Sequence, residues 1–205
     1  MCVRSTIAAL TFAAALTAVL ALGPAGCSRG PAGVDEPGSY AAANTNDCLP
    51  AVTLVDQHGC DVSLASLKGR PVLIDFIYTM CPGPCPLMTS RMGAVAKLLG
   101  PKLGSQITFV SISIDPEHDT PAVLEKYARA RGADETGWLF LTGTPARIDQ
   151  VLAVFNMKRM RNADGTLNHA AASFLLGPDG RQMRQYQPLE VEASTVVADI
   201  DRVLG

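Results

Sequence analysis

One stretch, VLIDFIYTMCPGPCPLM at residues 72–88, constrains the fold of this chain more than any other. It opens with an apolar run rich in branched and aromatic residues, 72–78, which predicts a buried central strand. Cys81 and Cys85 follow this run. Prolines stand between and after the two cysteines, and proline is tolerated only in the first turn of a helix. We therefore expect a helix to begin at the cysteines.

Apolar residues continue at helical spacing beyond the cysteines, which predicts a core-facing helix. They are Met88, Met92, Val95 and Leu99. The two thiols would then lie where a buried strand passes into a helix N-terminus. The unpaired N–H groups and the dipole at that end favour thiolate over thiol.

The cysteine pair has three intervening residues, where a thioredoxin has two. Positions i and i+4 of a helix share one face, with Cβ atoms about 5–6 Å apart. Two thiolates in that arrangement can close around one soft metal ion. Thiolates favour copper(I) and zinc, and an added imidazole suits copper in either oxidation state. A simple inert disulfide between Cys81 and Cys85 is the alternative, and the spacing does not exclude it.

The order of the remaining segments predicts an α/β, thioredoxin-like fold with an N-terminal β-hairpin extension. Residues 106–114 form a second apolar strand, which should run parallel to the first through a right-handed crossover. The other expected elements are a hairpin over 48–64, helices beginning at Thr120-Pro121 and Thr144-Pro145, a hairpin over 170–187 and a helix over about 190–204.

The chain has three histidines, which are candidates for a third metal ligand. His58 lies in an expected hairpin turn and His118 in a polar loop, so neither requires a special role. His169 directly precedes the apolar strand that begins at Ala170. In a thioredoxin-like fold the loop entering that strand faces the cysteine turn, so we expect His169 to be the ligand.

Four stretches resemble the Sco/SenC family of copper proteins that assist assembly of cytochrome c oxidase. They are FIYTMCPGPCPLM (76–88), SISIDPEHDTPAVLEKYA (111–128), LTGT (141–144) and NHAAASFLLGPDGR (168–181). The resemblance covers roughly residues 48–204. Carried over residue by residue, the family's copper ligands fall on Cys81, Cys85 and His169. Members often carry an acidic residue between the cysteines, where this chain has Gly83-Pro84.

The resemblance implies a copper metallochaperone that binds copper(I) or copper(II) and delivers it to the binuclear copper site of an oxidase subunit, without turnover. The alternative is a membrane-tethered thiol–disulfide oxidoreductase that reduces the cysteines of the receiving subunit. That chemistry needs Cys81 and Cys85 as a redox-active pair and no histidine. A thiol peroxidase is a third interpretation, but it would need neither this cysteine spacing nor His169.

The N-terminus predicts export. Arg4 is followed by an apolar run over 5–22 and by small residues before Cys27, so residues 1–26 are interpreted as a lipoprotein-type signal peptide. Cys27 would be lipidated and anchor the protein to the outer, periplasmic face of the bacterial cytoplasmic membrane. An uncleaved membrane anchor is the alternative. Residues 27–47 would form a flexible spacer, and 48–205 the thioredoxin-like domain.

Composition limits the partners. The net charge is −2, from 17 basic and 19 acidic residues, and no basic patch favours nucleic acid. The basic loop over residues 157–161 is interpreted as solvated, with docking as the alternative, and Met80 as core filler, with an accessory soft ligand as the alternative. In the oxidising compartment, Cys48 and Cys60 are predicted to form a disulfide across the N-terminal hairpin.

Overall fold

The computed structural model describes residues 48–133 and 136–205. The predicted signal peptide over 1–26, the lipidation of Cys27 and the spacer over 27–47 lie outside the described residues. Among the described residues, none of the helices is both long enough and apolar enough to cross a bilayer. The fold below therefore concerns the predicted thioredoxin-like domain.

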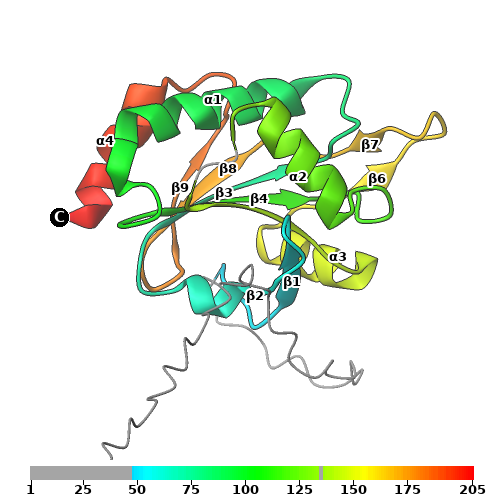
Figure 1. Ribbon diagram of the computed structural model, residues 1–205, viewed down its shortest axis with the longest axis horizontal. Helices are drawn as coiled ribbons and strands as arrows, with labels where there is room; N and C mark the ends of the chain where they lie inside the picture. Colours follow the sequence, from blue (N-terminus) through cyan, green and yellow to red (C-terminus); the bar gives the residue numbers. More distant parts are fainter. Residues whose placement is uncertain (1–47, 134–135) are drawn as a thin grey trace, which may run out of the picture.

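A seven-stranded sheet in the order β2-β1-β5-β4-β3-β8-β9 forms the centre of the domain (Figure 1). Its three middle strands run parallel, which confirms the predicted parallel pairing of β3 and β4. On the other side of β3, β8 runs antiparallel to β3, and β9 runs antiparallel to β8. The strands are β1 (Thr53–Asp56), β2 (Asp61–Ser63), β3 (Val72–Ile77), β4 (Thr108–Ser113), β5 (Trp138–Thr142), β8 (Ser173–Leu176) and β9 (Gln182–Tyr186). This is the predicted thioredoxin-like fold, with the hairpin β1–β2 added antiparallel to β5 at one edge.

Four α-helices cover the sheet: α1 (Pro84–Leu99), α2 (Pro121–Ala130), α3 (Pro145–Val154) and α4 (Ala193–Leu204). Helices α1 and α4 pack side by side on the same side of the sheet as α2, and α3 covers the other side (Figure 1). Thr120 and Thr144 cap α2 and α3 by accepting N–H groups in the first turn, as their Thr-Pro pairs predict.

The centre of the core lies under β3, which is buried at every position. Side chains of a strand alternate between the two faces of a sheet. Phe76 meets Phe155, which follows α3, with ring centroids 5.2 Å apart, and Phe174 of β8 at 6.2 Å. Asp75 therefore points to the opposite face, toward the side of α1. This alternation places a carboxyl group beneath the helix that carries Cys85.

The sequence spacing predicts Val123, Tyr127 and Ala130 as the core face of α2, and this prediction is partly wrong. Val123 is 38% exposed, and Ala130 is exposed at the last turn. The helix instead buries Leu124, Tyr127 and Ala128. Tyr127 is common to both faces, and its ring packs against Phe140 of β5, with centroids 6.1 Å apart.

The connection between α3 and β8 contains a small hairpin that the sequence analysis treated only as a polar segment. Its strands are β6 (Met160–Arg161) and β7 (Leu167–Asn168), which pair antiparallel. We call residues 160–169 the histidine hairpin, because His169 follows its second strand. Its strands pair only with each other and are not part of the central sheet.

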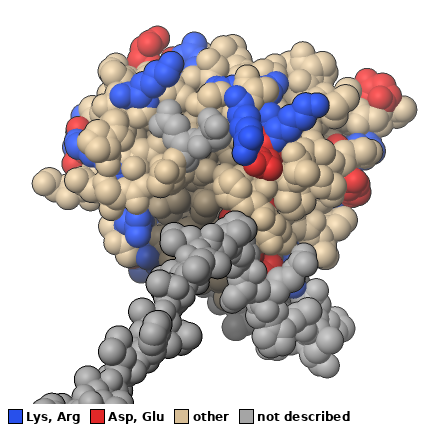
Figure 2. All heavy atoms as spheres, in the orientation of Figure 1, with Lys and Arg blue, Asp and Glu red and all other residues tan. Residues whose placement is uncertain are grey.

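Acidic and basic side chains lie next to one another over the surface seen in Figure 2. Several are paired in the structure, including Lys102 with Asp201 at 2.7 Å and Arg129 with Glu125 at 2.6 Å. Both pairs are exposed, and exposed pairs contribute little to stability. Variants that break these exposed pairs are therefore suitable controls for the ion pairs near the site.

Candidate metal and redox site

The two cysteines lie in a turn between β3 and α1; residues 78–85 are called the cysteine turn here. Cys85 is in the first turn of α1, while Cys81 precedes the helix, whose N-cap is Gly83. The expectation that both lie on one helix face is therefore wrong for Cys81. Proline disfavours the helical conformation in the residue before it, and the prolines on both sides of Gly83 delay the helix until Pro84.

Both thiols are buried, Cys85 completely and Cys81 with 8% of its surface exposed. Burial alone would raise the pKa of Cys81. Hydrogen bonds to its sulfur from the Cys85 thiol, from the backbone of Cys85 and Gly83 and from the Tyr78 side chain outweigh burial, so this pKa lies below its ordinary value. Burial raises the pKa of Cys85, and its hydrogen bond to Cys81 raises it further. Of the two thiols, Cys81 therefore loses its proton more readily than Cys85.

His169 lies next to this cysteine pair in the structure, although it is distant from it in the sequence. Its Nε2 lies 3.9 Å from Sγ of Cys85. Its Nδ1 lies 3.0 Å from the carbonyl oxygen of Ala170. A carbonyl only accepts, so Nδ1 carries the proton and Nε2 presents its lone pair to the sulfur. Burial lowers the pKa of His169, which also favours the neutral ring that metal binding requires.

The Cys85–His169 distance fits a metal ion bound between the two side chains. Bonds of about 2.3 Å to sulfur and about 2.0 Å to nitrogen, as found for zinc, span at most about 4.3 Å. Over residues 48–133 and 136–205, however, no three His, Cys, Asp or Glu side chains form a preassembled metal-binding group. Binding by Cys81, Cys85 and His169 together would thus require the three to draw closer.

Tyr78 connects the two halves of the site, a role that the sequence analysis missed. Its hydroxyl accepts the backbone N–H of Leu167 in β7 at 3.4 Å. Its ring meets the ring of His169 edge-on, with centroids 6.1 Å apart. The same side chain hydrogen-bonds to the sulfur of Cys81. The sequence gives no local signal for the contacts of Tyr78 with Leu167 and His169, because both residues lie far from it along the chain.

The other two histidines lie elsewhere. His58 is exposed in the β1–β2 turn, where its backbone N–H donates to Asp56. His118 is 62% exposed at its side chain, and its Nδ1 lies 2.9 Å from Oδ1 of Asp115. Of the three histidines, His169 is the one whose ring contacts a cysteine sulfur, as predicted.

The predicted disulfide between Cys48 and Cys60 is wrong for this structure. Cys48 is a thiol, whereas Cys60 is disulfide-bonded, so the two are not joined to each other. The carbonyl of Cys60 accepts the N–H of Asp56 at the closed end of the hairpin. Cys48 lies outside the hairpin, because its own N–H donates to the carbonyl of Gly180 in the β8–β9 turn. The two cysteines lie on either side of residues 56–59 in the sequence, but this placement does not bring their sulfurs together.

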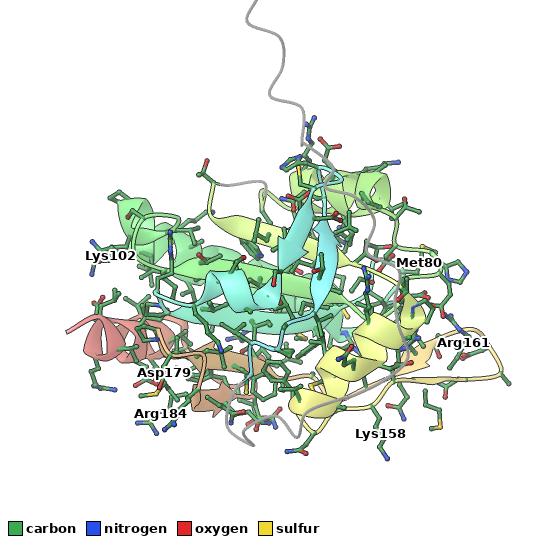
Figure 3. All side chains as sticks on the ribbon, turned by 90° about the horizontal axis from the view of Figure 1, so that it is seen from below. Met80, Lys102, Lys158, Arg161, Asp179 and Arg184 are labelled. Carbon is green, nitrogen blue, oxygen red and sulfur yellow. The ribbon has the colours of Figure 1, made fainter. Side chains whose placement is uncertain are left out.

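Met80 is 76% exposed, so its interpretation as core filler is wrong. Its thioether stands in solvent next to Cys81, and an accessory soft ligand remains a prediction. Figure 3 shows Met80 and Arg161 toward one end of the molecule, and Lys102 and Asp179 toward the other. The 157–161 loop is only partly solvated: Met157 is buried, and both arginines of the loop form ion pairs.

Comparisons with known proteins agree with this geometry. The SCO1/SenC family model matches residues 41–205. A SCO1 protein homolog of Bacillus subtilis (strain 168) is 34% identical over 141 residues, which are 67% of this chain and 72% of the relative. The match includes most of the described domain.

Three solved structures share the fold. A SCO1/SenC family lipoprotein from Bacillus anthracis str. Ames has a TM-score of 0.72 at 26% identity, covering 78% of this chain and 96% of that one. Bradyrhizobium japonicum ScoI with copper bound has 0.65 at 32% identity, covering 74% and 96%. BsSco, described with a disulfide switch and as a member of the Sco family of cytochrome c oxidase assembly proteins, has 0.66 at 32% identity, covering 78% and 94%. Since the family model spans most of its length and the site residues lie within it, this chain belongs to the SCO1/SenC family.

Proposed function

We propose that this protein binds a copper ion through Cys81, Cys85 and His169. It delivers that ion to the binuclear copper site of cytochrome c oxidase during assembly of the enzyme. The observation that carries the proposal is the approach of the His169 Nε2 lone pair to within 3.9 Å of the Cys85 sulfur. A relative of known structure was described with copper bound, which supports copper as the cargo.

The donor set suits copper in both oxidation states. Two thiolates bind copper(I) well, and the imidazole adds a harder donor that helps to hold copper(II). Binding must displace the protons that the free protein holds on its thiols, so copper affinity should rise with pH. The lowered pKa of Cys81 makes its deprotonation easier than that of Cys85, whose proton must be released to solvent when a metal binds.

Metal analysis of the reduced full-length protein tests this assignment. The Cys81→Ser/Cys85→Ser double variant should lose stoichiometric copper. His169→Ala should weaken copper(II) binding and change its visible spectrum, while copper(I) binding falls less because both thiolates remain. His58→Ala is the matched control, since His58 is exposed and remote. The assignment fails if His169→Ala holds copper(II) as His58→Ala does.

A thiol–disulfide oxidoreductase is the second candidate, and the state of the cysteine pair favours it. Exchange requires a low-pKa thiolate as nucleophile and a neighbouring thiol to resolve the mixed disulfide. Cys81 has the lowered pKa, and the Cys85 thiol is hydrogen-bonded to it. BsSco was described with a disulfide switch, which supports redox chemistry in this family.

His169→Ala separates the two functions in cells. Its loss should leave thiol–disulfide exchange intact, because both cysteines remain. Copper delivery predicts lower oxidase activity under copper limitation and partial rescue by added copper. Near-normal oxidase activity in that strain, with exchange intact, would favour the reductase.

We further propose that Cys27 is lipidated and tethers the domain to the outer face of the cytoplasmic membrane. The sequence pattern before Cys27 and the description of a Bacillus anthracis relative as a lipoprotein support this location. Mass measurement of the mature protein should show loss of residues 1–26 and added acyl mass. A mature chain with an unmodified N-terminus after Cys27 would exclude lipidation.

A further inference from the structure

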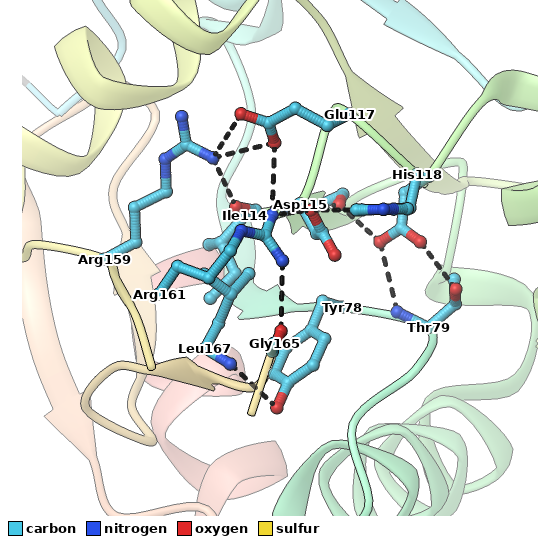
Figure 4. A network of polar contacts seen from close by, with 12 residues as sticks. Tyr78, Thr79, Ile114, Asp115, Glu117, His118, Arg159, Arg161, Gly165 and Leu167 are labelled. Carbon is cyan, nitrogen blue, oxygen red and sulfur yellow. Dashed lines mark hydrogen bonds and ion pairs between the residues drawn. The ribbon is translucent and has the colours of Figure 1, made fainter. Parts of the chain in front are cut away.

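The loop between β4 and α2 contacts both halves of the candidate site (Figure 4). We call residues 115–119 the acidic loop, because Asp115, Glu117 and Asp119 lie within it. Asp115 and Glu117 pair with arginines of the segment that leads into the histidine hairpin. Asp119 is bound to the cysteine turn. The acidic loop therefore contacts both the cysteine turn and the histidine hairpin.

On the side of the cysteines, Asp119 accepts two hydrogen bonds from Thr79. Its carboxylate accepts the backbone N–H of Thr79 at 3.1 Å and the Thr79 hydroxyl at 2.5 Å. The Ser113 hydroxyl at the end of β4 donates to the same carboxylate at 2.5 Å. Asp119 is completely buried. The turn that carries Cys81 is thus fixed to the end of the neighbouring strand.

Toward the histidine, Arg161 of β6 binds Asp115 at 2.5 Å. Asp115 is buried, while the Arg161 side chain is 37% exposed. The same guanidinium donates to the carbonyl of Gly165 at 3.1 Å, inside the turn of the histidine hairpin. Arg161 pairs with Leu167 across the hairpin, two positions before His169.

A second arginine strengthens this connection. Arg159 precedes β6 and binds Glu117 at 3.1 Å and Asp149 of α3 at 2.8 Å. It also donates to the carbonyl of Ile114 at 3.0 Å. The histidine hairpin has two-residue strands that pair only with each other, so its own backbone hydrogen bonds restrict it weakly. Its position relative to the cysteines depends on contacts of this kind.

From these contacts we infer that the Asp115–Arg161 pair is a positioning device for His169, which sets the distance of its ring from the cysteine sulfurs. The inference rests on the proposed copper site. Neither Asp115 nor Arg161 touches the ion; both act through the hairpin that presents the imidazole. Asp119 fixes Thr79 at the start of the cysteine turn, so the acidic loop connects the turn that carries Cys81 with the hairpin that presents His169.

The test is copper(II) binding by Arg161→Gln in the reduced full-length protein, with the visible spectrum recorded alongside. Loss of an outer-sphere orienting contact typically costs 10–100-fold in metal affinity, so we expect a loss of about 10-fold and a changed spectrum. Copper(I) affinity should change less, because both thiolates remain. Asp115→Asn should give the same result, and the double variant should be no worse than either alone.

Two controls make the result specific. Arg129→Gln removes an exposed Arg–carboxylate pair on α2 and should leave the spectrum and both affinities unchanged. In a His169→Ala background, Arg161→Gln should have no further effect on copper(II), because the side chain it positions is gone. An equal loss in that background, or an unchanged spectrum in Arg161→Gln, would overturn the inference. If His169→Ala itself matches wild type, the proposed copper site fails rather than the positioning step.

Discussion

The cysteine turn follows a six-residue strand that is buried at every position, whereas His169 follows a hairpin of two-residue strands. β3 lies in the middle of the sheet, paired with β4 on one side and β8 on the other. The histidine hairpin lies outside that sheet and is bound through arginines and carboxylates. The strand that leads into the cysteine turn is thus held by apolar burial, and the histidine hairpin mainly by charged hydrogen bonds.

The difference implies that the two halves respond to different perturbations. Apolar burial is not screened by salt, while exposed or partly exposed ion pairs weaken as salt screens them. Cavity formation under β3 should lower the stability of the whole domain. Loss of a charged contact should loosen the hairpin and leave the rest folded.

The largest expected effect is that of Phe76→Ala. Phe76 packs against Phe155 and Phe174, so its truncation opens a cavity on the α3 side of β3. We expect a loss of about 3–5 kcal/mol in the free energy of unfolding, measured by urea denaturation. Phe76→Leu, which keeps most of the volume, should lose clearly less. Equal losses in the two variants would contradict the cavity explanation.

Asp75 gives the next largest effect, and it depends on pH. This carboxyl group is fully buried in β3, neither oxygen has a hydrogen-bond partner, and burial raises its pKa to about 7. A raised pKa in the folded state stabilises the protein below the unfolded value of 3.8, and this contribution is lost as pH rises toward about 7. The loss should reach at most about 4 kcal/mol above pH 7.

Asp75→Asn should remove this pH dependence. The free energy of unfolding of the variant, minus that of wild type, should rise between pH 4 and pH 7 and then level off. Urea denaturation at several pH values measures the difference, in which other titrating groups largely cancel. A difference that is constant across this range would show that Asp75 is not the source.

Arg159→Gln should have a smaller and more local effect. Its side chain is 12% exposed and contacts Glu117, Asp149 and the Ile114 carbonyl. We expect a loss of about 1–2 kcal/mol, concentrated in the histidine hairpin. Hydrogen exchange at the Leu167 amide should accelerate, while exchange in β3 stays slow. Lys102→Gln, which breaks an exposed pair on the far side, is the control; equal acceleration in β3 and the hairpin would refute the local description.

Salt should give the smallest effect. Raising the ionic strength from about 0.05 to about 1 M shortens the screening length to about 3 Å and weakens the pairs around the hairpin by less than about 1 kcal/mol in total. Hydrogen exchange of the hairpin should rise slightly relative to that of β3. A uniform change in both regions would remove the distinction between them.

Local sequence signals predicted the parallel centre of the fold well. Apolar runs bounded by turn residues gave β3 and β4, and the Thr-Pro pairs gave the starts of α2 and α3. These signals work because capping and strand burial depend on neighbouring residues. His169, the proposed ligand, was identified from its place before β8, which follows from the fold as a whole.

Other features depend on contacts that no local pattern reveals. The Tyr78 hydroxyl reaches Leu167, and Asp119 reaches Thr79, across 89 and 40 positions in the sequence. Cys48 bonds to the β8–β9 turn instead of facing Cys60, because the segment before β1 leaves the hairpin. Each of these contacts is a hydrogen bond between residues that are distant in the sequence. Spacing in the sequence cannot specify such a partner.

The two sulfurs differ in exposure, so the site is accessible from the side of Cys81. Cys85 is completely enclosed, while Cys81 keeps 8% of its surface open beside the exposed Met80. An incoming thiol or imidazole from a partner therefore meets Cys81 before it can reach Cys85. Exchange of an ion through this opening would proceed one bond at a time, with the enclosed sulfur the last to be replaced. On the proposed function, copper would therefore enter and leave on the side of the site where Cys81 is exposed.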